Sequence, residues 1–398
     1  MSEATASQPG PGAAGSARPL NLLYSEAESE LRAAVRDVLA DKAPWTDVLA
    51  RTETAETYDS ALWRTLAADV GLAGLLIGEE HGGAGASYRE AAVVAEEIGR
   101  AVAPVPFLGS AVVATTAVLS AEDTGLLGAL ASSEVTAALA VPFASTPGVL
   151  APGGVRLTGS PSGGESANYR LSGQVLGVAD ALPADVLLVP ADGVPFGLYA
   201  VRVADGGVGM APVVSLDQTR QLADLSFDEA PARQIASGKN AEAAVLAALL
   251  AGAGVLASEQ LGLADRALEL TVAYVKERRQ FARPVGGFQA IKHRLADLWV
   301  AVTQARAVAR AAADRLSQRA GTEAELAVAL AKQACSDTAM KAAQEMIQLH
   351  GGIGFTWEHP AHLVLKRAKA DSIGFGTADA HRASLAQLAN LPAPAAGG

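Results

Sequence analysis

The sequence predicts an α+β protein with a helical N-terminal domain, a middle β domain of the barrel or sandwich kind, and a C-terminal four-helix bundle. Three observations support this fold class. Apolar residues first recur at helical spacing, short apolar runs between turns follow, and strong helical periodicity returns from about residue 241. The predicted limits are 1–20 for a flexible tail, 21–132 for the N-terminal domain, 133–236 for the β domain and 237–392 for the bundle.

The bulk composition indicates a globular protein and argues against two kinds of partner. Of the 398 residues, 50% are hydrophobic and 18% are charged, and the formal net charge is -11. An acidic chain lacks the basic face that nucleic-acid phosphates require. The most apolar stretch, "AAVLAALLAGAGVLA" at 243–257, is too short and too glycine-interrupted for a membrane span, so it predicts a buried helix. We therefore expect neither nucleic acid nor a membrane as a partner.

The single cysteine, Cys335, excludes an intramolecular disulfide and suits a reducing cytoplasm. Its surroundings, "AKQACSDTAM", are typical of a packed helix face, which favours a buried and inert thiol over a reactive one. A cytoplasmic location is the expectation that follows. No residue is expected to bind a metal.

The N-terminal zone opens with a helix-capping signal and contains a glycine-rich turn. Ser25 precedes the first helical run, and Glu28 stands three residues later, which is the spacing of a capping box. Farther along, "GLAGLLIGEEHGGAGAS" is predicted to be a loop. Its GGxG pattern is a weak signal and is more often a turn than a phosphate cradle.

The middle zone predicts antiparallel strands rather than a nucleotide-binding α/β unit. Short runs such as "ANYRLSGQVLGV", "ADVLLVPADG" and "FGLYAVRVADGGVG" alternate with turns, as in a sandwich or barrel. No GxGxxG motif joins a strand to a helix, so a Rossmann domain is not predicted.

The C-terminal zone predicts long helices joined by short turns. Apolar residues at 261, 264, 268, 272 and 275 keep helical spacing, and so do those at 291, 295, 298, 302 and 305 after the turn "ARPVGG". A short Pro-Gly turn between two such helices favours antiparallel packing in a bundle. The alanine-rich segment "AVALAKQACSDTAMKAAQEMIQLH" predicts another helix, which Gly351 and Gly352 would end.

Lysine and arginine crowd the start of "YVKERRQFARPVGGFQAIKHRLADL" at 274–298, although the chain as a whole is acidic. One interpretation is a solvated helix end, where cations complement the helix dipole. The other is a grip for an anionic cofactor. The composition alone does not choose between them.

Two C-terminal segments resemble the signatures of the acyl-CoA dehydrogenase family: "KERRQFARPVGGFQAIKHRLADL" and "QLHGGIGFTWEHPAHLVLKRAKA". The resemblance covers almost the whole chain, because "LWRTLAADVGLAGLLIGEEHGGAGAS" is similar to the family's N-terminal helical domain and "VVSLDQTRQLADLSFDEAP" to the end of its β domain. The resemblance implies the three-part fold described above, FAD as cofactor, and oxidation of acyl-CoA thioesters to 2,3-enoyl-CoA.

The resemblance also implies where FAD is held. Family members bind FAD across a dimer interface. Arg278 would contact the pyrophosphate or the ADP part of a neighbouring subunit's FAD, Gln280 would hydrogen-bond it, and Phe281 would pack on the adenosine. A diphosphate suits the forked donors of arginine. The resemblance adds a further set of expected cofactor residues: Gln348, Gly351, Gly352, Thr377 and Asp379. The alternative for the two glycines is a simple helix stop.

The family's catalytic base, a glutamate that takes the substrate α-proton, is missing from both places where it is expected. Those positions are Phe375, in "SIGFGTADAHR", and Gly252, on the long helix before the first signature. Neither side chain accepts a proton, so no catalytic residue is predicted.

Substitute residues for the base are not convincing in the sequence. Glu259, seven residues from Gly252 and about two helical turns away, is interpreted mainly as a solvent- or interface-facing helix residue, and Glu242 is no better placed. His381 and Glu358 lie in family-matching stretches and are expected to serve structure.

The β domain departs from the family as well, since "AALAVPFASTPGVL" lacks the glutamate and glycines of the usual flavin-contacting turn, and "SGQVLGVADALPADVLL" lacks an aromatic residue. The contacts given to a neighbour's FAD are thus retained, while those for the chain's own flavin are degraded. This pattern predicts a non-catalytic subunit of a heteromeric dehydrogenase, similar to actinobacterial members that act on steroid or other bulky CoA thioesters. Two alternatives stay open, a self-sufficient dehydrogenase with an unrecognised base and a non-enzymatic scaffold.

The implied partners are an acyl-CoA substrate, a second dehydrogenase subunit in a heterotetramer, and an electron-transfer flavoprotein as acceptor.

Overall fold

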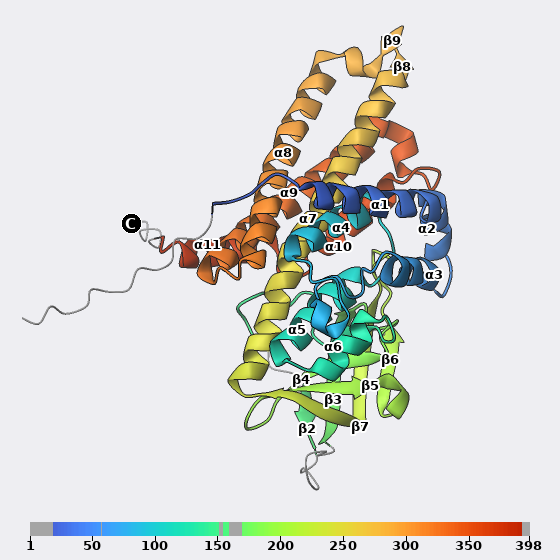
Figure 1. The fold of residues 1–398 in the computed structure, drawn as a ribbon. Coiled ribbons are helices and arrows are strands. Elements are labelled where there is room, and N and C mark those ends of the chain that lie inside the picture. Colours follow the sequence, from blue (N-terminus) through green and yellow to red (C-terminus); the bar gives the residue numbers. More distant parts are fainter. Residues whose placement is uncertain (1–18, 57, 151–153, 159–168, 392–398) are drawn as a thin grey trace, which may run out of the picture.

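The computed structural model describes residues 19–56, 58–150, 154–158 and 169–391, and it shows helices, then a sheet, then helices again (Figure 1). The predicted fold class is confirmed. The switch to strands falls between Ala131 and Ala137, and the switch back falls between Ser237 and Lys239. Most of the expected tail, 1–20, lies outside the described residues.

The N-terminal part is built from short helices. They are α1 (Glu26–Lys42), α2 (Trp45–Thr52), α3 (Ser60–Arg64), α4 (Tyr88–Ala101), α5 (Thr115–Ala121) and α6 (Thr124–Ala131), with π-helical turns at Thr65–Asp69 and Phe107–Ala114. The predicted capping box begins α1: the Ser25 hydroxyl accepts the Glu28 N–H at 3.1 Å, and the Ser25 N–H donates to the Glu28 carboxylate at 2.6 Å. These two bonds satisfy backbone donors that the first helical turn leaves free.

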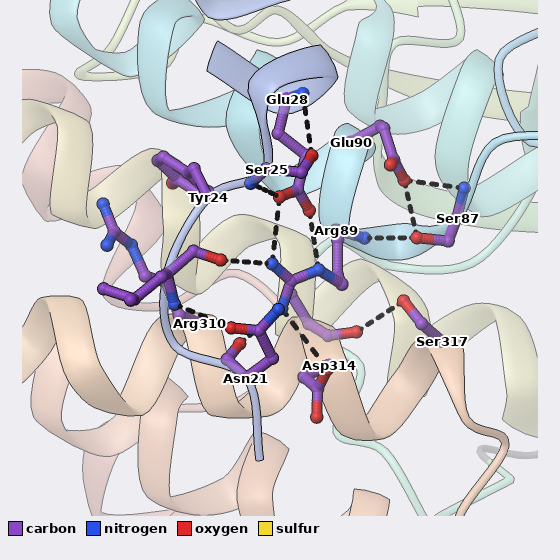
Figure 2. A network of polar contacts seen from close by, with 12 residues as sticks. Asn21, Tyr24, Ser25, Glu28, Ser87, Arg89, Glu90, Arg310, Asp314 and Ser317 are labelled. Atoms are coloured by element: carbon purple, nitrogen blue, oxygen red, sulfur yellow. Dashed lines mark hydrogen bonds and ion pairs between the residues drawn. The ribbon is translucent and has the colours of Figure 1, made fainter. Parts of the chain in front are cut away.

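The segment before α1 is fastened to two other helices by one arginine (Figure 2). Arg89 of α4 donates to the Glu28 carboxylate at 2.6 Å and to the carbonyl of Leu23 at 2.7 Å. It also reaches Asp314 of helix α8 (Gln289–Ser317) at 3.3 Å, while Arg310 of α8 donates to the carbonyl of Leu22 at 3.0 Å. The start of the described chain is therefore tied to the C-terminal bundle.

The middle part is a seven-stranded sheet in the order β1-β4-β5-β7-β3-β2, with β6 paired to β7. The strands are β1 (Ala137–Leu139), β2 (Val155–Leu157), β3 (Tyr169–Ala179), β4 (Val186–Ala191), β5 (Gly197–Arg202), β6 (Val208–Pro212) and β7 (Leu222–Ser237). The predicted antiparallel pairing holds for every named pair except β1 with β4, which is parallel.

The C-terminal part is a helical bundle around a helix of 39 residues, α7. Its helices are α7 (Lys239–Glu277), α8 (Gln289–Ser317), α9 (Thr322–His350), α10 (Ala361–Asp371) and α11 (Ala378–Leu388), and a small hairpin of β8 (Arg279–Gln280) and β9 (Arg283–Pro284) joins α7 to α8. In Figure 1, α7 runs from the sheet through the bundle to this hairpin. The predicted long helices around "ARPVGG" are confirmed.

Helix α7 is long and apolar enough to cross a membrane, but 72% of its most apolar 18-residue window is buried inside the protein. This burial confirms the predicted core helix. Glycines allow α4 and α7 to cross in backbone contact, since a Cβ on Gly99 would lie 2.2 Å from the carbonyl oxygen of Glu259, and one on Gly262 would lie 1.9 Å from that of Glu96. Cys335 is buried, and burial raises the pKa of its thiol to about 12, as the inert interpretation predicts.

Candidate functional site

The two predicted base positions meet in space. Gly252 lies on α7, and Phe375 lies in the loop between α10 and α11. A Cβ on Gly252 would lie 2.9 Å from the ζ carbon of the Phe375 ring and 2.9 Å from a γ-methyl of Val113. The two segments that could supply a base therefore converge on one point, and neither brings a titratable group to it.

Phe375 is held firmly at this point. Its ring is 5% exposed and lies edge-to-face against Phe143, with ring centroids 5.5 Å apart. Its N–H donates to the Phe143 carbonyl at 2.7 Å, and its own carbonyl lies 2.8 Å from Nε2 of His381. Burial lowers the pKa of His381 to about 4, so the ring is neutral. The geometry agrees with the structural role expected of His381.

Little space remains beside the Phe375 ring. The cavity at this place has a volume of about 20 Å³, which is room for about one water molecule. Its apolar walls are Leu108, Val113, Leu139, Val141, Phe143, Ala179 and Phe375, and its polar walls are Asp180 and Arg220. We use the name chamber for the space that these residues enclose, including the part of it that the Phe375 ring fills.

The interpretation of Glu259 as a solvent- or interface-facing residue is wrong. Its side chain is 2% exposed and is bound by two arginines: Arg220 lies 2.7 Å and 2.8 Å from the two carboxylate oxygens, and Arg367 lies 2.6 Å from one of them. Burial alone would raise the pKa of Glu259, but the two positive charges outweigh it and the pKa falls below its ordinary value. An ionised carboxylate held in this way is not available as a base. Glu242, in the first turn of α7, is about 15 Å along the helix from Gly252.

Sequence reasoning missed the rest of this buried cluster. Asp371, at the end of α10, lies 3.6 Å from Arg220 and 3.7 Å from Arg367, yet its carboxylate accepts no hydrogen bond from the described residues. Burial, and then the charge of Glu259, raises the pKa of Asp371 to about 8. The i,i+4 spacing of Arg367 and Asp371 was the one sequence signal that could have indicated this pair.

Lys332 of α9 completes the cluster and holds both ends of the Phe375 loop. Its ammonium donates to the carbonyl of Asp371 at 2.9 Å and to that of Gly376 at 3.3 Å. Burial lowers the pKa of Lys332 to about 8. The loop that carries Phe375 is thus fixed by a buried lysine on one side and by His381 on the other.

The first set of predicted cofactor residues lies at the far end of α7, on the β8–β9 hairpin. Arg278, Gln280 and Phe281 are all exposed, and the Phe281 side chain is 86% exposed. Within the described part of the chain, the guanidinium of Arg278 makes no ion pair and no hydrogen bond. The solvated-helix-end interpretation accounts for its exposure. It gives no reason for an exposed phenylalanine three residues later.

The turn after α9 lies at the same end of the molecule, so Gln348, Gly351 and Gly352 lie near the hairpin. The hydroxyl of Tyr274 in α7 donates to the carbonyl of His350 at 3.3 Å, and the two rings stack with centroids 4.3 Å apart. Gly351 ends α9 with φ +61, as the helix-stop interpretation predicts. Both glycines are exposed, and a Cβ on either would meet no atom within 4 Å.

Thr377 and Asp379 lie elsewhere, at the start of α11 beside the chamber. The Thr377 hydroxyl caps α11 by accepting the N–H of Ala380 at 3.3 Å, and Asp379 pairs with Arg382 at 2.5 Å. The eight predicted cofactor residues therefore form two separate groups, six at the hairpin end and two beside the chamber.

We call the first of these groups the distal surface: Arg278, Gln280, Phe281, Gln348, Gly351 and Gly352.

Known proteins resemble this chain over most of its length. The family models for the N-terminal and C-terminal domains of acyl-CoA dehydrogenases match residues 25–123 and 243–389. The acyl-CoA dehydrogenase IpdE2 of Mycobacterium tuberculosis is 36% identical over 344 residues, which cover 86% of this chain and 91% of that protein.

Two solved structures contain chains similar to this one. A variant of the Tcur3481–Tcur3483 steroid ACAD is 30% identical with a TM-score of 0.80, covering 92% of this chain and 98% of that chain. The ChsE4–ChsE5 complex from Mycobacterium tuberculosis is 26% identical with a TM-score of 0.82, covering 94% of this chain and 100% of that chain. This chain belongs to the acyl-CoA dehydrogenase family, whose members are FAD-dependent oxidoreductases acting on CH–CH bonds.

Proposed function

We propose that this chain is a subunit of a heteromeric acyl-CoA dehydrogenase that oxidises a bulky acyl-CoA thioester, such as a steroid derivative. In this proposal the chain lacks a catalytic base of its own and contributes FAD contacts to a partner subunit. The names of two structural relatives support the assembly, because each name contains two components and one of them is a steroid ACAD.

One observation carries the proposal: the distal surface and the base position stand at distant points of one helix. Gly252 and Arg278 are separated by 26 residues of α7 and its C-cap, or about 39 Å. An FAD molecule whose flavin lay in this chain's chamber would not reach its own hairpin. The guanidinium of Arg278, which has no partner in the part of the chain that the structure describes, is instead free to meet a cofactor held by another subunit.

The residues of the distal surface fit the ADP half of FAD by their chemistry. Arg278 would give forked donors to the diphosphate, Gln280 would donate or accept a hydrogen bond there, and Phe281 would stack on the adenine. Gln348 and the open backbone at Gly351 and Gly352 would complete the pocket, since no side chain shields those peptide groups. When bound, FAD supplies the flavin that accepts a hydride from the substrate β-carbon.

Thr377 and Asp379 remain a second predicted set of cofactor contacts, separate from the distal surface.

In this proposal the partner subunit supplies the general base that removes the substrate α-proton. A general base must reach the substrate α-proton directly or through one water. Phe375 and Gly252 have no acceptor, and Glu259 is ionised within a pair of arginines. A base from the partner would leave this chain the tasks of binding and orienting the cofactor.

A self-sufficient dehydrogenase is the second candidate, and one carboxylate favours it. Asp180 lines the chamber, and burial raises its pKa, as a base requires. However, Oδ2 of Asp180 accepts the N–H of Gly109 at 2.9 Å and lies 3.5 Å from Arg220, and the charge of Arg220 lowers the pKa of Asp180 against the effect of burial, which weakens this carboxylate as a base. This candidate predicts a yellow, active protein when the chain is purified alone. A non-enzymatic scaffold, the third candidate, predicts a colourless protein even with a partner.

Co-expression tests these candidates. The chain would be produced alone and together with a second dehydrogenase subunit, and the flavin absorbance of each purified sample would be recorded. We expect little or no FAD in the chain alone, and FAD with turnover in a four-chain complex containing two copies of each subunit. Stoichiometric FAD in the isolated chain, or a lone monomer by light scattering of the native complex, would contradict the proposal.

The physiological setting is also part of the proposal. An electron-transfer flavoprotein is the expected acceptor, and the single buried cysteine supports a cytoplasmic location.

A further inference from the structure

The chamber is closed by side chains that fit against glycines. The Phe375 ring occupies the space that a side chain at position 252 would need, and the Phe143 ring lies 2.3 Å from where a Cβ on Gly374 would be. The aromatic pair has its own edge-to-face contact, and the Arg220 guanidinium lies 5.5 Å from the Phe143 ring centroid. Large residues at 143 and 375 thus match the absence of side chains at 252 and 374.

The backbone holds the Phe375 ring in the chamber although its conformation is unfavourable. Phe375 has φ +50, a left-handed conformation that a bulky residue rarely adopts. The hydrogen bonds to Phe143 and His381, and the two bonds from Lys332 to the loop ends, keep it there. Several contacts from different elements therefore enforce one position of the ring.

We propose that Phe375 and Phe143 form an aromatic plug that fills the acyl chamber of this chain. A base at 252 or 375 would have to reach the α-carbon of an acyl group, so the space beside these positions is where that group would lie. The walls around the ring, including Leu108, Val113 and Leu139, are apolar and suit an acyl chain. The plug excludes such a chain by shape, in addition to the missing base.

This inference rests on the proposed function and deepens it. The proposed function says that the chain supplies no base, whereas the plug says that the chain has no room for an acyl group. The two can fail independently, because the plug can be tested in the isolated full-length chain without flavin, partner or turnover.

A double-mutant cycle between Gly252→Ala and Phe375→Ala tests the fit by thermal unfolding of the full-length chain. Alone, Gly252→Ala should lower Tm, because its methyl would meet the ring and Val113 at 2.9 Å. In the Phe375→Ala background the same change should lower Tm by clearly less, because the contacts with the ring are gone, only the contact with Val113 remains, and alanine favours the helix. An equal shift in both backgrounds would overturn the proposal. If Phe375→Ala does not fold, Phe375→Leu carries the same cycle and the same outcomes apply.

Ligand binding gives an independent test. Benzene, which matches the ring that is removed, should bind one molecule per chain of Phe375→Ala and raise its Tm, as it does in apolar cavities made by truncation. The wild-type chain should show neither effect. Octanoyl-CoA is the second probe, and the isolated wild-type chain should not bind it. Stoichiometric octanoyl-CoA binding by the wild-type chain, or no benzene binding by the variant, would show that the ring does not fill an acyl chamber.

Discussion

The distal surface and the chamber are the two places where this chain resembles a flavin enzyme, and they differ in every physical respect. At the distal surface the side chains are exposed, one arginine is unpaired among the described residues, and a phenylalanine stands in solvent. In the chamber an aromatic ring is buried against glycine, and the charges behind it are paired with one another.

This difference indicates which of the two places has binding groups left for another molecule. The Phe375 ring in the chamber is packed by residues of this chain, whereas the Arg278 guanidinium at the distal surface has no partner among the described residues and Phe281 has only an edge-to-face contact with Phe288. A sequence comparison that counts matching flavin residues treats both places alike. The arrangement in space supports the proposal that one is a surface for a neighbour's cofactor, and it places the other in a buried core.

The largest expected effect sharpens the comparison at the chamber. Replacing Glu259 with alanine would leave Arg220 and Arg367 buried without their shared carboxylate, and breaking a buried pair in this way costs roughly 3–5 kcal/mol. Urea unfolding of the isolated chain measures the loss. Asp337→Ala removes a half-exposed partner of Arg382 and is the matched control, with an expected cost below about 1 kcal/mol. Equal effects of the two changes would mean that the cluster does not support the chamber.

The next effect tests the distal surface. Arg278→Ala in the assembled complex should weaken FAD retention by about one to two decades, because charge-assisted hydrogen bonds contribute roughly 1.5–3 kcal/mol. FAD release is followed by flavin fluorescence during dilution. Arg279→Ala removes the same charge from the next hairpin residue, which is also exposed, and should leave FAD retention almost unchanged. If both variants lose FAD equally, the surface attracts FAD by its overall positive charge. Specific hydrogen bonds from Arg278 to the diphosphate would then be ruled out.

A pH dependence separates the buried cluster from the surface. Burial raises the folded-state pKa of Asp371 to about 8, so this group favours folding at low pH and its contribution is lost as pH rises through 8. One such group lowers the unfolding free energy by up to about 1.4 kcal/mol per pH unit. Between pH 5 and 8 the unfolding free energy of the wild type, measured relative to that of Asp371→Asn, should show this decline. Identical slopes in the wild type and in Asp371→Asn would mean that Asp371 is not the group that binds the proton.

Lys332 acts in the opposite direction in a higher pH range. Its folded-state pKa of about 8 lies below its ordinary value, so its contribution to stability rises as pH increases above 8. Four histidines with lowered pKa values, His350, His359, His362 and His381, also make stability fall as pH falls below about 6.5. The difference between the wild type and Asp371→Asn, in which these contributions cancel, therefore reports on Asp371.

Local and periodic features of the fold could be predicted from the sequence. The capping box at Ser25 and Glu28 involves residues three apart, and the long helices α7 and α8 follow from their apolar spacing. The assignment of Gly252 and Phe375 as the two base positions stays a prediction from the resemblance, which places each of them by its neighbours along the chain. The structure adds that Gly252 and Phe375 are in contact.

The features that could not be predicted depend on pairs far apart in the chain. Glu259 was misjudged because its partners, Arg220 and Arg367, are 39 and 108 residues away and their burial leaves no local signal. A glutamate within a helix is usually exposed, and only the tertiary arrangement overrides that rule. For the same reason the contact between Phe143 and Phe375 could not be predicted from the sequence. Both residues lie in segments that lack a glutamate implied by the family resemblance.

The last substitution, Phe375→Glu, is expected to have no effect on dehydrogenase activity. Phe375→Glu restores a carboxylate at one base position, but it restores neither the flavin contacts of the β domain nor the opposite end of a cofactor site, which lies about 39 Å away along α7. The new carboxylate would also stand among Val113, Phe143 and other apolar walls, where burial disfavours its ionised form. We therefore expect no oxidation of octanoyl-CoA by the isolated variant in an assay with an artificial electron acceptor, and unchanged turnover in its complex with the partner. Turnover by the isolated variant would mean that the chamber is an intact active site lacking only its base. In that case the distal surface and the chamber would belong to one complete enzyme, and the contrast between them would disappear.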